Sequence, residues 1–93
     1  MSGSARAIVH VDNERVIVTE YRFGPNDNTG WHRHGRDYVV VPLLDGRLRI
    51  VNADGESYAE MKAGAPYFRK EGVEHDVINA SGGDYAFIEI ELK

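Results

Sequence analysis

Three of the four histidines stand at spacings that suit a metal site. His32 and His34 lie two residues apart in the segment Gly-Trp-His-Arg-His-Gly, and His75 follows in a second glycine-containing segment. In a β-strand, residues i and i+2 share a face and lie about 6.6–6.8 Å apart along the chain. The imidazoles of His32 and His34 can therefore converge on one ion, while Arg33 points to the other face. His75, on a separate strand, is the candidate third ligand, with metal–nitrogen bonds of about 2.0–2.1 Å.

The fourth histidine, His10, has no partner at ligand spacing. A histidine that stands alone in a strand is more often structural or solvent-exposed than a metal ligand. We therefore expect His10 to lie outside the site.

Glycine, asparagine and aspartate divide the chain into short segments. The pairs Asp12-Asn13, Asp45-Gly46, Asp54-Gly55 and Gly82-Gly83 tolerate the positive φ that tight hairpins require. The β-branched and aromatic runs between the breaks predict about nine strands, at residues 6–11, 15–23, 31–34, 37–44, 47–52, 57–62, 66–69, 75–79 and 84–92. No stretch has the spacing of an amphipathic helix, so the sequence predicts a small all-β sandwich or barrel.

Two of these runs carry expectations about burial. Residues 84–92 alternate with period two, and Glu89 and Glu91 are most simply read as part of a solvated face. The run 38–44 is apolar throughout, which predicts a strand that is central in its sheet and covered on both sides.

Length and composition limit the classes of protein that fit. A chain of 93 residues makes one domain, spanning 1–93 with a core at about 5–93. The absence of cysteine excludes disulfide scaffolds and cysteine-ligated metal folds. The net charge of −4 argues against nucleic acid as a partner. No apolar run approaches the roughly 18 residues of a membrane span, and no secretory signal is recognisable, so we expect a cytoplasmic protein without a membrane partner.

The second glycine-containing segment carries a longer pattern. The chain resembles the cupin family, one of whose two motifs reads G-x5-P-x-G-x2-H-x3-N. At that spacing this sequence has Gly64, Lys70 in the proline position, Gly72, His75 and Asn79. We expect Asn79 to hold a turn or backbone rather than to contact a ligand.

The first cupin motif, G-x5-H-x-H-x3–4-E-x6-G, is matched in part. His32, His34 and Gly46 are present, but Asn26 replaces the leading glycine and Val39 stands where the family has glutamate. The usual carboxylate ligand is therefore missing. Asp37 is the nearest substitute, since it shares the strand face of Val39, and on this register Tyr38 faces away. Asp37 has two simpler roles, as an acceptor that orients a histidine ring or as an ion-pair partner of Arg36.

The resemblance covers nearly the whole chain, and the segments around both motifs look like a subgroup of small single-domain cupins labelled as beta-alanine degradation proteins. It implies a cupin-type jelly-roll β-barrel of two antiparallel sheets. In such a barrel, His32, His34 and His75 would line one end of the interior and hold one divalent transition metal. Imidazole ligands suit Fe, Zn, Ni and Cu, with Mn also considered, and the order of affinities does not choose among them.

Three neutral imidazoles leave a divalent ion with its full charge, which favours a small anionic or chelating ligand in a dry barrel. Resemblance to other three-histidine cupins points to a metal-dependent enzyme of the dioxygenase type. Lewis-acid chemistry on zinc or manganese and a non-catalytic cupin that binds or senses a small ligand both stay open.

Two more residues are candidates for contact with a substrate. Tyr67 and Arg69 share a strand face just before the second motif, so they can place a phenol or a guanidinium at the mouth of the site. A short barrel with exposed strand edges commonly dimerises, and the strand at residues 6–11 is the candidate for exchange between the two chains of a homodimer.

Overall fold

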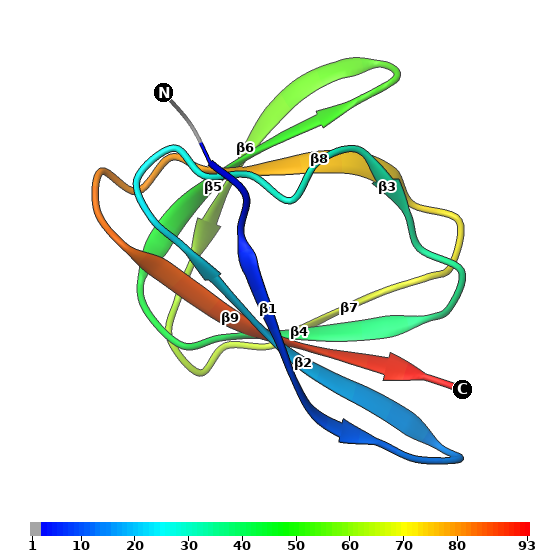
Figure 1. The fold of residues 1–93 in the computed structure, drawn as a ribbon. Helices are drawn as coiled ribbons and strands as arrows, with labels where there is room; N and C mark the ends of the chain where they lie inside the picture. The colour runs from blue at the N-terminus through cyan, green and yellow to red at the C-terminus, as the bar shows by residue number, and fades with distance from the viewer. Residues whose placement is uncertain (1–2) are drawn as a thin grey trace.

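Two antiparallel β-sheets face each other in the computed structural model, which describes residues 3–93 (Figure 1). The strands are β1 (Arg6–Asp12), β2 (Val16–Phe23), β3 (His32–Arg33), β4 (Tyr38–Pro42), β5 (Gly46–Asn52), β6 (Gly55–Met61), β7 (Tyr67–Arg69), β8 (Glu74–Asn79) and β9 (Tyr85–Leu92). One sheet has the order β1-β2-β9-β4-β7 and the other β3-β8-β5-β6. Within residues 3–93 no helix forms, and hence none that could cross a membrane. The predicted jelly-roll architecture of two antiparallel sheets is confirmed.

The β5–β6 hairpin illustrates how the turn residues set the register. Asn52 pairs with Gly55, so only residues 53–54 form the loop between the two strands. Gly55 has a φ of 129°, a backbone conformation that L side chains rarely adopt. The glycine that the sequence places after Asp54 therefore allows the chain to reverse at this point.

The core between the sheets is built from aromatic and aliphatic side chains. Phe23, Tyr38, Val40, Leu48, Met61, Val77, Tyr85 and Phe87 form one buried cluster. The rings of Phe23 and Phe87 have centroids 5.5 Å apart in a tilted arrangement, which is favourable for aromatic pairs. With no disulfide available, this packing is what holds the two sheets together.

Strand β4 lies between β9 and β7 but is not covered on both sides as expected. Tyr38 and Val40 are buried, whereas Val39 between them is partly exposed. After the strand ends at Pro42, Leu43 and Leu44 are 40% and 45% exposed. The run therefore behaves as an alternating strand followed by a bend, and Tyr38 rather than Val39 faces the interior.

Asn79 at the end of β8 has the structural role expected for it. Its side chain is buried and donates hydrogen bonds to the carbonyls of Gly24 and Gly83 at 3.0 and 2.7 Å. Its Oδ1 accepts from the Ser81 N–H at 3.0 Å. Asn79 thus connects the β8–β9 turn to the loop that follows β2.

Candidate metal centre

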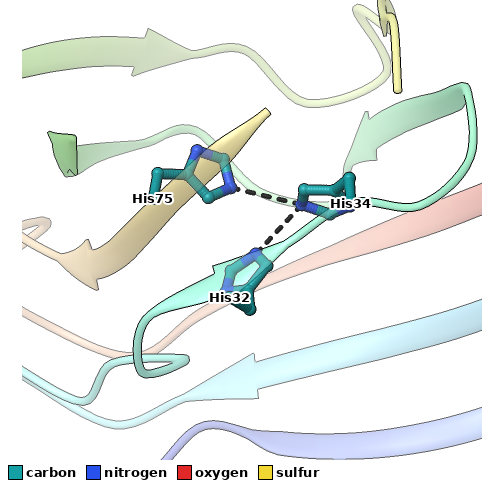
Figure 2. Close-up of side chains that lie close together, drawn as sticks. All are labelled: His32, His34 and His75. Carbon is teal, nitrogen blue, oxygen red and sulfur yellow. Dashed lines mark hydrogen bonds between the residues drawn. The ribbon is translucent and has the colours of Figure 1, made fainter. Parts of the chain in front are cut away.

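The three predicted histidines come together at one end of the four-stranded sheet (Figure 2). β3 pairs with β8 in a register that sets His32 directly opposite His75. His34 follows the short strand β3, and two hydrogen bonds join its backbone to the segment just before β8. Its N–H donates to the Val73 carbonyl at 2.8 Å, and its carbonyl accepts from the Gly72 N–H at 2.7 Å.

The three imidazoles meet through their Nε2 atoms. His34 Nε2 lies 2.9 Å from His32 Nε2 and 3.2 Å from His75 Nε2. Nitrogen ligands that share an ion at about 2.0–2.1 Å are themselves roughly 2.8–3.4 Å apart. The spacing of the donor atoms is therefore that of ligands to a common ion.

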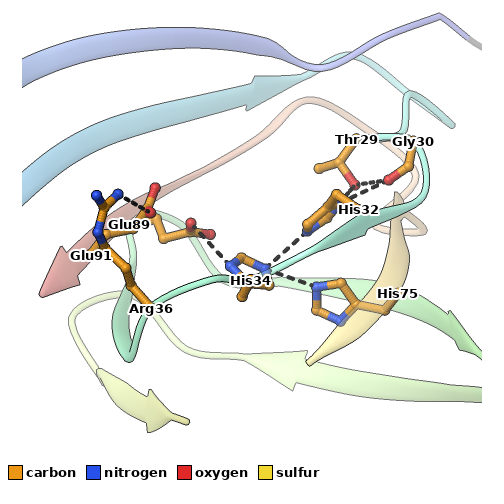
Figure 3. Close-up of polar contacts among 8 residues, drawn as sticks. All are labelled: Thr29, Gly30, His32, His34, Arg36, His75, Glu89 and Glu91. Carbon is orange, nitrogen blue, oxygen red and sulfur yellow. Dashed lines mark hydrogen bonds and ion pairs between the residues drawn. The ribbon is translucent and has the colours of Figure 1, made fainter. Parts of the chain in front are cut away.

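The tautomer of His32 is set by its surroundings (Figure 3). Its Nδ1 lies 2.8 Å from the Gly30 carbonyl oxygen, which can only accept, so Nδ1 carries the proton and donates. Nε2 of His32 is then left with a free lone pair directed at the other two rings. Asp76 holds this loop in place, because its carboxylate accepts from the Gly30 N–H at 3.1 Å and from Asn28 Nδ2 at 3.0 Å.

Burial keeps two of the three rings neutral. Desolvation, followed by the neighbouring His32 and His75, lowers the pKa of His34 to about 4. Desolvation, followed by His32, also lowers the pKa of His75 to about 4, although Asp76 opposes the shift. Neutral imidazole is the form that binds metal, so His34 and His75 are in their ligating form at neutral pH.

Tyr38 forms a wall against one of these rings. Its ring is stacked on that of His34 with centroids 3.9 Å apart and an interplanar angle of 16°. The expectation that Tyr38 faces away from the site is therefore wrong. The error is one residue in the register of β4, which is enough to exchange the two faces of a strand.

A cavity of about 300 Å³ opens beside the three histidines. Its opposite wall comes from the five-stranded sheet and consists mainly of aromatic and acidic side chains, namely Tyr21, Tyr38, Tyr67, Phe87, Glu89 and Glu91. A cavity of this size accepts a small metabolite.

The structure places Tyr67 and Arg69 differently with respect to this cavity. Tyr67 lines it, and burial raises the pKa of its phenol. Arg69 is exposed, with its guanidinium carbon 4.5 Å from the centre of the Tyr67 ring. Arg33, expected on the opposite face, also lines the cavity.

Asp37 is not brought to the histidines. Its Oδ1 accepts a hydrogen bond from the Glu71 N–H at 2.8 Å, and it borders a different surface depression. Asp37 lies two residues before Val39 and therefore on the same face of the chain. Because Tyr38 faces the interior, Asp37 faces outward. The histidine group therefore contains no carboxylate from this residue.

Glu89 is the site residue that sequence reasoning missed. It was expected on a solvated face, but its side chain is only 8% exposed and its Oε1 lies 3.7 Å from His34 Nδ1. Burial, followed by repulsion from Glu91, raises the pKa of Glu89 to about 7. The available signal was its parity in β9, because Glu89 shares a strand face with the buried aromatic residues Tyr85 and Phe87.

Comparisons with known proteins agree with this architecture. No protein-family model matches the chain. The beta-alanine degradation protein BauB of Pseudomonas aeruginosa is 56% identical over 95 residues, covering 100% of both chains. A cupin domain from Bordetella pertussis Tohama I is 48% identical and has a TM-score of 0.97, covering 100% of this chain and 97% of that one. An RmlC-like cupin from Methanocaldococcus jannaschii, with 11% identity and a TM-score of 0.78 over 96% and 80% of the two chains, shares the double-stranded β-helix fold alone.

Proposed function

The chain belongs to the cupin family, and we propose that it is a mononuclear metal-dependent enzyme of the dioxygenase type that acts on a small anionic or chelating metabolite. His32, His34 and His75 are the proposed ligands of one divalent transition metal. The metal is one of iron, zinc, nickel, manganese and copper.

One observation carries this proposal. Three imidazoles from two segments far apart in the sequence direct their Nε2 atoms at one point, with separations of 2.9 and 3.2 Å from the central His34. Lone pairs at this distance repel one another unless a proton or a cation lies between them. Because His32 carries its proton on Nδ1, a proton on Nε2 of His34 can bridge only one of the two contacts, whereas a shared cation satisfies both.

A divalent ion bound by three imidazoles alone supplies Lewis acidity and open positions for a substrate and dioxygen. The chain's own residues supply the remainder of the site. Tyr38 and Phe87 form an apolar wall that limits water around the substrate. Tyr67 lines the cavity, and its phenol is the proposed group that orients a substrate carboxylate, with the exposed guanidinium of Arg69 packed against the Tyr67 ring.

A small carboxylate is the proposed substrate class. The Pseudomonas aeruginosa relative is named a beta-alanine degradation protein, and beta-alanine is itself a small carboxylate. The cavity of about 300 Å³ suits molecules of this size. The positive charge of a histidine-bound ion favours binding of the carboxylate group.

The metal is tested first, by elemental analysis of protein purified without added metal or a histidine tag. We expect about one transition-metal ion per chain in the wild type and a background level in His75→Ala. The matched control is His10→Ala, because His10 is exposed and contacts Glu20 rather than the cluster. Equal metal content in His75→Ala and the wild type would contradict the proposed site.

Enzymatic turnover is tested separately, by measuring oxygen uptake with the protein after anaerobic reconstitution with Fe²⁺. We expect oxygen uptake on addition of a small carboxylate, and no uptake with His32→Ala. If the chain binds the carboxylate saturably but does not consume it, the enzymatic proposal is wrong. The chain is then a cupin that binds or senses a small ligand.

A further inference from the structure

Glu89 carries a mostly buried carboxylate that lines the cavity, and within residues 3–93 its side chain forms no hydrogen bond. It lies in the middle of β9, with Thr19 of β2 and Val40 of β4 as its neighbours across the sheet. Only 8% of its side chain is exposed, and its Oε1 lies 3.7 Å from Nδ1 of the His34 imidazole. A buried carboxylate is unfavourable unless something pairs with it.

The other charged groups nearby do not supply that partner. Glu91, two residues further along β9, is the residue that meets Arg36, with Oε2 and Nη1 3.8 Å apart. Figure 3 shows the carboxylate of Glu89 directed instead toward the side of His34 that faces away from the other histidines. Glu89 and Glu91 therefore differ in what they face, although both line the same cavity.

The ring of His34 has two distinct ends. Nε2 points to His32 and His75, whereas Nδ1 points to Glu89 at 3.7 Å. Ligation through Nε2 requires the proton of the neutral ring to be on Nδ1. Closure by about 0.9 Å would bring that N–H to the usual length of a charge-assisted hydrogen bond, about 2.8 Å.

We propose that Glu89 is a positioning residue of the three-histidine centre: its carboxylate accepts the Nδ1–H of His34 and supplies a negative charge next to the ion. The inference rests on the proposed metal-binding function. The Nδ1–H of His32 donates to the neutral carbonyl of Gly30. In this proposal, the Nδ1–H of His34 donates to the charged carboxylate of Glu89. A carboxylate behind a histidine makes that ring a more basic ligand.

This role also accounts for the missing carboxylate ligand. Val39 stands where the cupin motif has glutamate, and Asp37 is turned outward. Glu89 brings a carboxylate to the centre from β9 instead, separated from the ligand nitrogen by one imidazole ring. The ion then keeps its open positions, while the charge of the whole centre is lowered by one.

The test compares Glu89→Gln with Glu91→Gln. Each substitution removes one negative charge from a residue of β9 that lines the cavity. The affinities of the wild type and both variants for Zn²⁺ and Co²⁺ are measured by competition with a chelator. We expect Glu89→Gln to weaken binding by about 10–100-fold and Glu91→Gln to change it by less than about threefold. In the Zn²⁺ form, the exchangeable Nδ1–H proton signal of His34 is expected to be protected from exchange in the wild type and in Glu91→Gln, and lost in Glu89→Gln.

The outcomes separate this inference from the proposed function. Equal weakening in the two variants would show a general charge effect and overturn the positioning role, as would an unchanged affinity of Glu89→Gln. If the wild type binds Zn²⁺ and Co²⁺ with the expected pattern but the Fe²⁺ form consumes no oxygen, Glu89 stands and the enzymatic proposal fails. A wild type that binds neither ion overturns both.

Discussion

His34 depends on its neighbours for its orientation more than the other two histidines do. His32 and His75 are paired across β3 and β8, whereas His34 lies beyond the end of β3. Its side chain is only 8% exposed and is stacked flat against Tyr38. The aromatic ring of Tyr38 therefore fixes the plane of the His34 ring, whose Nε2 faces His32 and His75.

We expect the ring of Tyr38, rather than its hydroxyl, to matter for metal binding. Tyr38→Phe keeps the stacked ring and should retain the wild-type Zn²⁺ affinity, whereas Tyr38→Leu should weaken it by up to about tenfold, since an aromatic pair contributes about 0.5–1.5 kcal/mol beyond its buried area. Chelator competition with Zn²⁺ measures both variants. An equal loss in Tyr38→Phe would mean that the hydroxyl, and not the stacking, supports the centre.

At the scale of single residues, the sequence predicts the three-histidine cluster well and the residues around it poorly. The histidines are identified by type and spacing, because few other patterns place three imidazoles in glycine-flanked strands. Tyr38 and Glu89 were both assigned to the wrong face. For Tyr38, an error of one position in the register of β4 exchanged the two faces. For Glu89, the acidic side chain was taken as a sign of exposure, although it shares a strand face with the buried Tyr85 and Phe87.

At the scale of the elements, hairpin turns and β-rich runs are local signals, and they predict the strands closely. The pairing of β3 with β8 is different, because it joins segments about forty residues apart. The periodicity of one segment does not indicate which distant strand that segment pairs with. The cluster was therefore predicted from the likeness to the cupin motifs, and the structure adds the register that sets His32 opposite His75.

Gly46, the first residue of β5, makes a close contact between the two sheets. A Cβ at this position would lie 2.4 Å from Cδ1 of the buried Tyr85 in β9 and 2.6 Å from Ser81 Oγ. We expect Gly46→Ala to destabilise the fold by about 1–3 kcal/mol, because the added methyl group overlaps the ring of Tyr85, which is buried in the core. Thermal unfolding followed by circular dichroism measures the loss.

Gly83→Ala is the matched control for this contact. A Cβ at Gly83 meets nothing within 4 Å, and Gly83 has no positive φ. Its melting temperature should stay close to that of the wild type. Unchanged stability of Gly46→Ala would contradict the tight contact with Tyr85, and a loss of Zn²⁺ affinity without a loss of stability would show that Gly46 acts on the metal centre instead.

At the scale of the whole molecule, the two sheets contribute different parts of the site. The four-stranded sheet and the loop after β3 bring the three imidazoles, whereas the five-stranded sheet brings the aromatic wall and Glu89. The cavity therefore exists only when both sheets are packed together. This arrangement explains why a site with three ligands needs nearly all of a 93-residue chain.

The same division leaves two long strand edges, at β1 and β6, which each have seven residues. Of the described edge strands, β3 and β7 have only two and three residues, and β6 carries Glu56 and Glu60 in ion pairs with arginines of β5. β1 is seven residues long and exposes Val9 and Val11 by 59% and 40%. An edge that combines free backbone groups with exposed apolar side chains favours pairing with another chain.

We therefore expect a homodimer formed through β1. Sedimentation equilibrium should give twice the chain mass for the wild type and one chain mass for Val9→Lys combined with Val11→Lys, because two charges at the contact oppose its burial. Leu43→Lys combined with Leu44→Lys is the control, since these leucines are exposed to a similar degree in the bend after β4. A monomeric wild type would contradict the expectation, and dissociation by the leucine pair alone would place the contact at the bend. Because β1 lies outside the cavity lining, both double variants should still bind Zn²⁺ with the wild-type affinity.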